Sequence, residues 1–290
     1  MAQRGMTKAF IIWSNIQRAG ESPLSMFGKS LRLSVPFWRA LTLGIVLFCF
    51  LTRPAMSADP MAPEVDKVLR SMSTFMESLS GFSVEMDVDN EIIDLTGQKL
   101  QFSSSGEIVF KRPDKLHVKR QGAIADVELL YDGKVLTLYG RNLNVYFQHE
   151  APGTTDDALD AIWNVLGFNA PGADLFYTDA HKELSEGVAS SSYLGTAYVN
   201  GVECHHLAFR EASVDWQLWI DAEGDPLPMK YVITTKWMTG APQFAIRFDI
   251  WNTSPEIDSG RFDFKAPEGA VKLETVSVDE LGKIVLEEKK

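Results

Sequence analysis

A helical pattern of apolar residues opens the globular part of the chain. Between Pro63 and Leu79, apolar residues recur every three or four positions, and Gly81 follows as a stop signal. The apolar positions are Val65, Val68, Leu69, Met72, Phe75, Met76 and Leu79. The pattern predicts an amphipathic helix of about four turns that packs on a sheet.

From Phe82 onward, apolar and polar positions alternate, which is the period of a strand. The segment from Gly106 to Val118 alternates on both sides of a break at Arg112-Pro113-Asp114, because proline lacks an amide donor and constrains the residue before it. This segment therefore predicts a hairpin whose corner carries a cation. Similar patterns predict further strands at 100–102, 127–131, 135–139, 193–199, 203–209, 214–220, 230–237 and 244–250, and a closing strand with Phe262 and Phe264.

Many short antiparallel strands with few helices indicate a mainly β, α+β fold. Asp132-Gly133 is a strong hairpin signal, because both residues tolerate a positive φ. The flanking segments 129–131 and 135–139 are apolar on both faces, as expected where a second layer covers the sheet. We expect a strongly curved antiparallel sheet, or half-barrel, in one domain from 59 to 275, followed by a charged, poorly ordered tail from 276 to 290.

The strand pattern stops at Thr154, where a second helical stretch begins. Thr154 or Thr155 can cap a helix, and Gly167 ends it. Its apolar stripe consists of Leu159, Ile162, Trp163 and Leu166. A shorter helical turn follows within 171–177. The residues allow two interpretations of this helical pair, a lid that opens over the sheet or a plug that fills the core permanently.

The first 58 residues are typical of a leader that is removed. Basic residues precede the apolar run from Ala40 to Leu51, and Ala55 to Ala58 offers small residues at the spacing of a signal-peptidase site. A run of about twelve apolar residues is too short for a permanent membrane span. We therefore expect export to the periplasm through a cleaved signal peptide. Either Met1 or Met26 can be the start codon.

Charge and cysteine content narrow the classes of function. Removing residues 1–58 takes seven of 28 Lys/Arg and one of 39 Asp/Glu, which leaves a net charge of −17. Such an acidic protein is a poor partner for nucleic acid or for an anionic membrane. Cys204 is the one cysteine after position 58, so no intrachain disulfide is expected there.

No pattern in the chain requires catalysis, a metal or a cofactor. On a strand, Cys204 and His206 share a face while His205 points away, so only two ligands converge. The carboxylates of Asp156, Asp157 and Asp160 fit a helix first turn, where the dipole favours anions. Hydrolase, phosphate-loop and dinucleotide motifs are absent from the sequence. We expect a binding protein, not an enzyme.

Three segments together resemble a known superfamily. They are G-E-I-V-F-K-R-P-D-K-L at 106–116, L-L-Y-D-G-K-V-L-T-L-Y at 129–139 and F-D-F-K-A-P-E-G-A at 262–270. In this order they resemble the LolA/LolB-like periplasmic lipoprotein carriers, and within them an uncharacterised family of predicted periplasmic proteins, over roughly Pro63 to Glu274. The resemblance implies a half-barrel with an N-terminal helix and a helical lid. It also implies that Arg112 holds the lid closed until cargo displaces it.

An exported, acidic domain with an interior rich in Trp and Phe suits a carrier of a hydrophobic ligand, either a lipid or the acyl chains of a lipoprotein. The candidate ligand-binding residues are Arg112, Phe110, Leu138, Trp163, Leu166, Leu175, Phe176, Trp216 and Leu218. Two alternatives remain open. One is an envelope sensor that binds a protein partner, and the other, less favoured, is a hydrolase.

Overall fold

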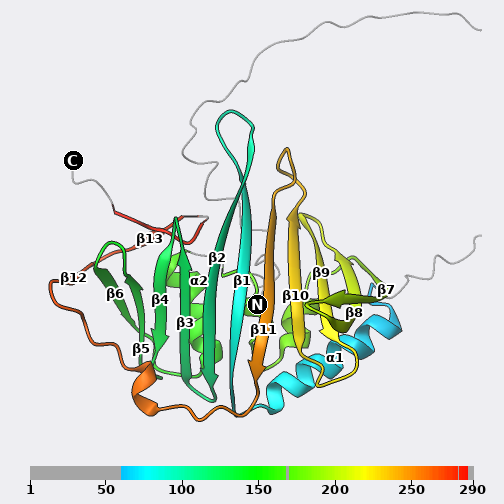
Figure 1. The fold of residues 1–290 in the computed structure, drawn as a ribbon, viewed down its shortest axis with the longest axis horizontal. Coiled ribbons are helices and arrows are strands. Elements are labelled where there is room, and N and C mark those ends of the chain that lie inside the picture. Colours follow the sequence, from blue (N-terminus) through cyan, green and yellow to red (C-terminus); the bar gives the residue numbers. More distant parts are fainter. Residues whose placement is uncertain (1–59, 168–169, 280, 287–290) are drawn as a thin grey trace, which may run out of the picture. The chain divides into compact units, whose positions relative to one another are not determined.

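One large antiparallel sheet dominates the computed structural model, which describes residues 60–167, 170–279 and 281–286. Twelve strands form it in the order β12-β6-β5-β4-β3-β2-β1-β11-β10-β9-β8-β7 (Figure 1). Within the described residues the sheet is open, with β12 and β7 as its two edges. The expected mainly β fold with a curved sheet is confirmed. The predicted leader and its cleavage site lie outside the described residues.

The elements follow the sequence pattern closely in the first half of the domain. Helix α1 spans Pro63–Ser78 and is followed by β1 (Gly81–Ile93), β2 (Lys99–Lys111), β3 (Lys115–Gly122), β4 (Asp126–Tyr131), β5 (Val135–Gly140) and β6 (Val145–Glu150). The corner at 112–114 joins β2 to β3 as predicted. Strand β6 had no counterpart among the predicted strands.

The second half contains the helical insertion and the returning strands. The insertion consists of α2 (Thr155–Leu166), a 3-10 turn η3 (Ala173–Leu175) and α3 (Ala180–Ser185). The strands are β7 (Ser190–Val199), β8 (Val202–Arg210), β9 (Val214–Asp221), β10 (Pro228–Thr235) and β11 (Gln243–Asn252). Helix α3 was not predicted, because its six residues are too few for a periodic pattern to be recognised.

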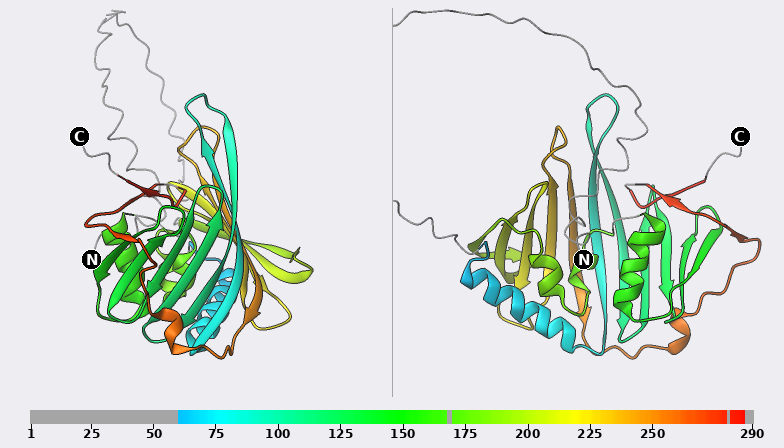
Figure 2. Two further views of the ribbon diagram at one scale, coloured as in Figure 1. Left: turned by 60° about the vertical axis from the view of Figure 1, so that its left-hand side comes forward. Right: turned by 180° about the vertical axis from the view of Figure 1, so that it is seen from behind.

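Strand pairing gathers the apolar positions on the concave face. Phe82 of β1 lies opposite Phe110 of β2, and Met86 of β1 lies opposite Phe248 of β11. Because side chains alternate along a strand, every second residue of these strands faces the same way. Helices α1 and α2 lie on this face, α1 over the half with β7 to β11 and α2 over the half with β2 to β6 (Figure 2, right).

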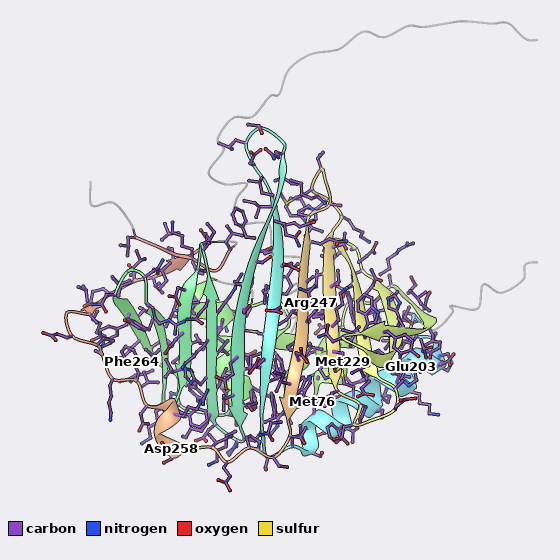
Figure 3. All side chains as sticks on the ribbon, viewed as in Figure 1. Met76, Glu203, Met229, Arg247, Asp258 and Phe264 are labelled. Atoms are coloured by element: carbon purple, nitrogen blue, oxygen red, sulfur yellow. The ribbon has the colours of Figure 1, made fainter. Side chains whose placement is uncertain are left out.

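The chain after β11 departs from the prediction. Phe262 belongs to a 3-10 turn, η4 (Ser259–Phe262), and the predicted closing strand at 262–264 does not form. Phe264 instead packs on Tyr139 and Tyr146, with ring centroids 5.6 and 5.1 Å apart, beside β5 and β6 (Figure 3). The edge strand is β12 (Val271–Lys272), which pairs parallel to β6. Aromatic contact, not strand pairing, thus holds Phe264.

The segment expected to be a poorly ordered tail carries a second, two-stranded sheet. It consists of β13 (Ser277–Val278) and β14 (Ile284–Val285). Ile284 is 2% exposed and belongs to the main hydrophobic core. The charged composition of the tail concealed these few apolar residues, whose burial depends on the main sheet.

Replacing Thr154 with Ala should destabilise the domain by roughly 0.5 to 2 kcal/mol. The Thr154 hydroxyl accepts a hydrogen bond from Asp157 N at 3.3 Å, and the Asp157 carboxylate accepts one from Thr154 N at 2.8 Å. Urea unfolding measures the loss. Thr239→Ala, in the exposed β10–β11 loop, is the matched control and should change stability by less than about 0.5 kcal/mol. Equal effects of both variants would contradict the capping role.

Candidate ligand-binding site

A cluster of aromatic rings lies where the helical insertion meets the sheet. Phe82 and Phe110 stack on the concave face with centroids 5.2 Å apart. Phe176, from the loop between η3 and α3, stacks on Phe82 at 5.7 Å and meets Phe248 edge-on at 5.9 Å. Trp251 touches both Phe82 and Phe248. Rings from strands β1, β2 and β11 therefore form an apolar shelf, and Phe176 covers it.

Residues 155–167 and 170–185, here called the covering segment, lie on the concave face beside α1 (Figure 2, right). Phe176 is 6% exposed, and Leu175 has no exposed surface. Leu159, Ile162 and Leu166 of α2 are also buried in the main core. The shelf is thus closed to solvent in this structure, and a ligand could reach it only if part of the covering segment moved.

Polar contacts attach the covering segment to the corner between β2 and β3. The Arg112 guanidinium donates to Thr178 Oγ1 at 3.1 Å and, more weakly, to the carbonyl of Phe176 at 3.5 Å. It also lies 5.0 Å from the centre of the Phe110 ring. At the same corner, the carbonyl of Pro113 accepts a hydrogen bond from Thr155 N at 2.8 Å. One corner of the sheet therefore contacts both the start of α2 and the loop that carries Phe176.

Asp156 extends this network across the covering segment. Its carboxylate accepts hydrogen bonds from Thr178 N at 3.0 Å and from the Thr178 hydroxyl at 3.2 Å. Burial lowers the pKa of Arg112, while the nearby carboxylates of Asp156 and Glu77 act in the opposite direction. Arg112 Nε is buried with no hydrogen-bond partner among the described residues. The guanidinium is thus only partly satisfied in the closed arrangement.

Tyr231 provides a second attachment, from the middle of β10. Its hydroxyl donates to Asp174 Oδ2 at 2.9 Å, and its ring meets Trp216 edge-on at 5.6 Å. Burial raises the pKa of Tyr231 well above its usual value, and the Asp174 carboxylate adds to the effect. The phenol therefore stays protonated as a donor, and it joins the η3 turn to the sheet.

Helix α3 is attached to α1 and not to the sheet corner. His181 N donates to Ser73 Oγ at 2.9 Å, and His181 Nε2 lies 2.8 Å from Asp66 Oδ1. The hydrogen bond from Arg70 lowers the pKa of Asp66, and His181 contributes in the same direction. The two ends of the covering segment thus have different anchors, the β2–β3 corner near α2 and helix α1 near α3.

The predicted binding residues fall into separate groups. Phe110, Arg112 and Phe176 come together at the corner. Leu138 is buried on β5, three strands from β2, and Trp216 and Leu218 are buried on β9, four strands from β2. At about 4.8 Å per strand, β5 and β9 lie roughly 14 and 19 Å from β2 when the spacing is counted across the sheet. Leu166 and Leu175 are buried in the covering segment, and Trp163 of α2 is half-buried.

Sequence reasoning did not select Phe82, Phe248, Tyr231, Asp156 and Thr178 as site residues. Phe82 and Phe248 stand at apolar positions of alternating strands, so their burial could have been inferred, but their contact with Phe176 could not. Trp216, which was selected, stacks on Phe209 at 3.6 Å and donates to buried Glu211 at 2.7 Å.

The cysteine and histidine pair engages separate partners. The Tyr193 hydroxyl lies 2.9 Å from His205 Nδ1, while His206 lies 2.9 Å from the Gln217 amide and stacks on Trp219. Burial raises the pKa of Cys204 to about 11. Among the residues that the structure describes, no three His, Cys, Asp or Glu side chains are placed to hold a metal ion.

Sequence comparison matches residues 65–276 to a family described as "Predicted periplasmic protein (DUF2092)". The chain belongs to this DUF2092 family. The resemblance to an uncharacterised family of predicted periplasmic proteins is therefore confirmed, and so is the periplasmic location. No curated protein sequence matches the chain significantly.

Several solved structures are similar to this DUF2092 protein at low sequence identity. An uncharacterised conserved protein from Thermus thermophilus has a TM-score of 0.44 at 9% identity, covering 72% of this chain and 98% of its own. The Mycobacterium tuberculosis lipoprotein LppX has a TM-score of 0.41 at 12% identity, covering 68% of this chain and 99% of its own. A LolA superfamily protein from Nitrosomonas europaea has a TM-score of 0.33 at 8% identity, covering 68% of this chain and 96% of its own.

In the part of the chain that the structure describes, no helix of this DUF2092 protein combines the length and apolar character needed to cross a membrane.

Replacing Tyr231 with Phe should reduce the free energy of unfolding by roughly 1 to 3 kcal/mol, because the substitution removes a buried donor to a carboxylate. Tyr198→Phe is the matched control. The Tyr198 hydroxyl also bonds a carboxylate, that of Glu203 at 3.2 Å, but it lies on an exposed part of β7. Its loss should cost less than about 0.5 kcal/mol. Denaturant unfolding compares the two, and equal stabilities would contradict the buried role of Tyr231.

Proposed function

We propose that this protein is a periplasmic binding or carrier protein for a hydrophobic ligand, a lipid or the acyl chains of a lipoprotein. The ligand would lie on the aromatic shelf of the concave face, under the covering segment. The role is one of binding without catalysis. The observation that supports it is that an apolar shelf from three strands is covered by Phe176, which a separate segment carries and a few rim contacts retain.

The free-energy cost of uncovering the shelf favours a long apolar chain as the ligand. Moving Phe176 and Leu175 away from the sheet would cost roughly 3 to 6 kcal/mol, at about 1.5 to 3 kcal/mol for each buried side chain. An acyl chain gains about 0.8 kcal/mol for each methylene it buries, so about ten methylenes would gain about 8 kcal/mol. Such a chain could displace the covering residues, whereas one of about four methylenes would gain about 3 kcal/mol, which only matches the lower end of that cost.

The Arg112 contacts are the proposed latch of the covering segment. Arginine suits this role, because its planar head can donate to two groups at once and keeps its charge when partly buried. Thr178 is its partner and also binds Asp156, so release of Arg112 would loosen the attachment between the loop and α2. The His181 attachment to α1 would remain, which makes α3 the fixed end of the movement.

Replacing Arg112 with Leu should open the covering segment more often. The lost hydrogen bonds are worth roughly 1 to 2 kcal/mol, or about a 5- to 30-fold change in an opening equilibrium. Amide hydrogens of residues 173–178 should exchange faster by that factor, and a fluorescent fatty acid should associate faster. Hydrogen exchange read by mass spectrometry and stopped-flow fluorescence measure the two effects.

Thr178→Val tests the same latch from the other side, and Lys111→Gln is the control. Lys111, the last residue of β2, directly precedes Arg112 and is exposed, so its replacement should leave exchange and association unchanged. If Arg112→Leu and Thr178→Val act through one contact, the double variant should be no more open than the stronger single variant. Wild-type exchange and binding in both single variants would eliminate the latch.

Trp163→Gln tests whether α2 takes part in binding. Because Trp163 is only half-buried, its replacement should cost clearly less than the roughly 3 to 5 kcal/mol typical of a buried Trp. We expect weaker binding of the fatty-acid probe with the fold retained, as judged by circular dichroism and equilibrium titration. Global unfolding of the variant would indicate that α2 is a permanent plug.

A sensor that binds a protein partner is the second candidate, and the hairpin tips favour it. Leu95, at the β1–β2 turn, is 108% exposed, and Trp237, in the β10–β11 loop, is 43% exposed. The two tips lie close together, since a Cβ on Gly240 would come within 2.8 Å of Ile93 Cδ1. A stoichiometric envelope protein that co-purifies with wild type, but not with a Leu95→Ser, Trp237→Ser variant, would favour this function.

A further inference from the structure

A second partly buried arginine lies on the concave face, away from Arg112. Arg120 of β3 lies opposite Gly106 of β2, so the two residues face the same side of the sheet. That side is the core side, because a Cβ added to Gly106 would lie 2.8 Å from the Met86 side chain. The other cross-strand neighbour of Arg120 is Val127 of β4, which packs against the hydrophobic core. Arg120 thus places a cation at the end of an otherwise apolar surface.

The contacts of Arg120 are neutral. Nε donates to Ser104 Oγ at 2.8 Å, and Nη1 donates to the carbonyl of Leu281 at 3.0 Å. Within the described ranges, no carboxylate lies within ion-pair distance of Arg120. Burial lowers its pKa, and the more distant Asp279 carboxylate counteracts this. A guanidinium in such surroundings favours an anion that can reach it, because an anionic acceptor adds a Coulomb attraction that a hydroxyl or carbonyl oxygen does not supply.

The Leu281 carbonyl belongs to a small structure that covers this end of the face. Residues 277–279 and 281–286, here called the C-terminal flap, include the β13–β14 pair. The Asp279 carboxylate holds its turn by accepting from Leu281 N at 3.0 Å and Lys283 N at 2.9 Å. A Cβ on Gly140 would lie 2.8 Å from Ile284 Cδ1, so the missing side chain of that glycine makes room for the flap.

The flap is anchored weakly compared with the sheet. Two strands of two residues each, the buried side chains of Leu281 and Ile284, the partly buried Val278 and one carbonyl from the flap to Arg120 hold it in place. A two-stranded hairpin of this size is not stable by itself. The Leu281 carbonyl is therefore an exchangeable hydrogen-bond acceptor for Arg120. An anion that competes for the guanidinium has to displace only the C-terminal flap.

We propose that Arg120 and Ser104 bind the anionic headgroup, a carboxylate or a phosphate monoester, of a single-chain amphiphile whose apolar chain lies on the concave face. The headgroup replaces the Leu281 carbonyl, and the C-terminal flap moves aside. This inference depends on the proposed binding function and specifies its ligand class. The apolar core between Arg120 and the aromatic shelf receives the chain, while the guanidinium selects the charge.

Three fluorescent probes of one chain length test the inference on the full mature protein. They are a fatty acid, its methyl ester and the corresponding alkyl phosphate. Wild type should bind at least one anionic probe about tenfold more tightly than the ester. Arg120→Gln should abolish that preference and leave ester binding within about twofold, whereas Arg120→Lys should retain part of it. The preferred anionic probe distinguishes a carboxylate from a phosphate ligand.

Lys119→Gln is the charge-matched control, because Lys119 precedes Arg120 on β3 and points to the opposite face. Ile284→Ser should release the flap and strengthen binding of the anionic probe. Val285→Ser is the matched control: Val285 is 40% exposed, so its replacement should leave probe binding unchanged. Equal binding of acid, phosphate and ester by wild type, or a preference that survives Arg120→Gln, overturns the inference and leaves the carrier function intact. Failure of wild type to bind any probe overturns both.

Discussion

The structure depends on covering the apolar concave face of its sheet. Alternation along β1, β2 and β11 sends Phe82, Phe110 and Phe248 to one side, and water cannot solvate such a surface without a large free-energy cost. A sheet that closed into a small barrel would fill this face with its own side chains. This sheet stays open across the described residues, so segments outside it have to supply the cover.

Three segments supply that cover, and they differ in how firmly they are held. Helix α1 contributes several fully buried residues, and the His181 contacts join it to α3. The covering segment combines buried apolar residues with polar contacts, made at the β2–β3 corner by Arg112 and in the buried interior by Tyr231. The C-terminal flap has two buried apolar side chains, Leu281 and Ile284, and one hydrogen bond with Arg120. Helix α1 is therefore a permanent part of the core, whereas ligand binding could displace the covering segment and the C-terminal flap.

Both concave-side arginines, Arg112 and Arg120, have neutral partners on a covering element. Each donates to a carbonyl and a hydroxyl, and neither forms an ion pair with a carboxylate in the described part of the chain. A guanidinium binds a neutral oxygen less strongly than a carboxylate, so these contacts retain a cover without making it permanent. A buried ion pair would have cost more to break, because it leaves an uncompensated charge behind.

Local patterns in the sequence determined the elements: the alternation of β1 and β2, the Arg112 corner, the cap of α2 and the turn at Asp132-Gly133. They follow from backbone geometry over a few residues, which is why these predictions were accurate. Only the tertiary structure decided that β1 pairs with β11, that Phe176 and not Trp216 meets Phe110, and that Ile284 is buried. These contacts join residues far apart in the chain, and each depends on the register of several strands between them. A local pattern contains no information about that register.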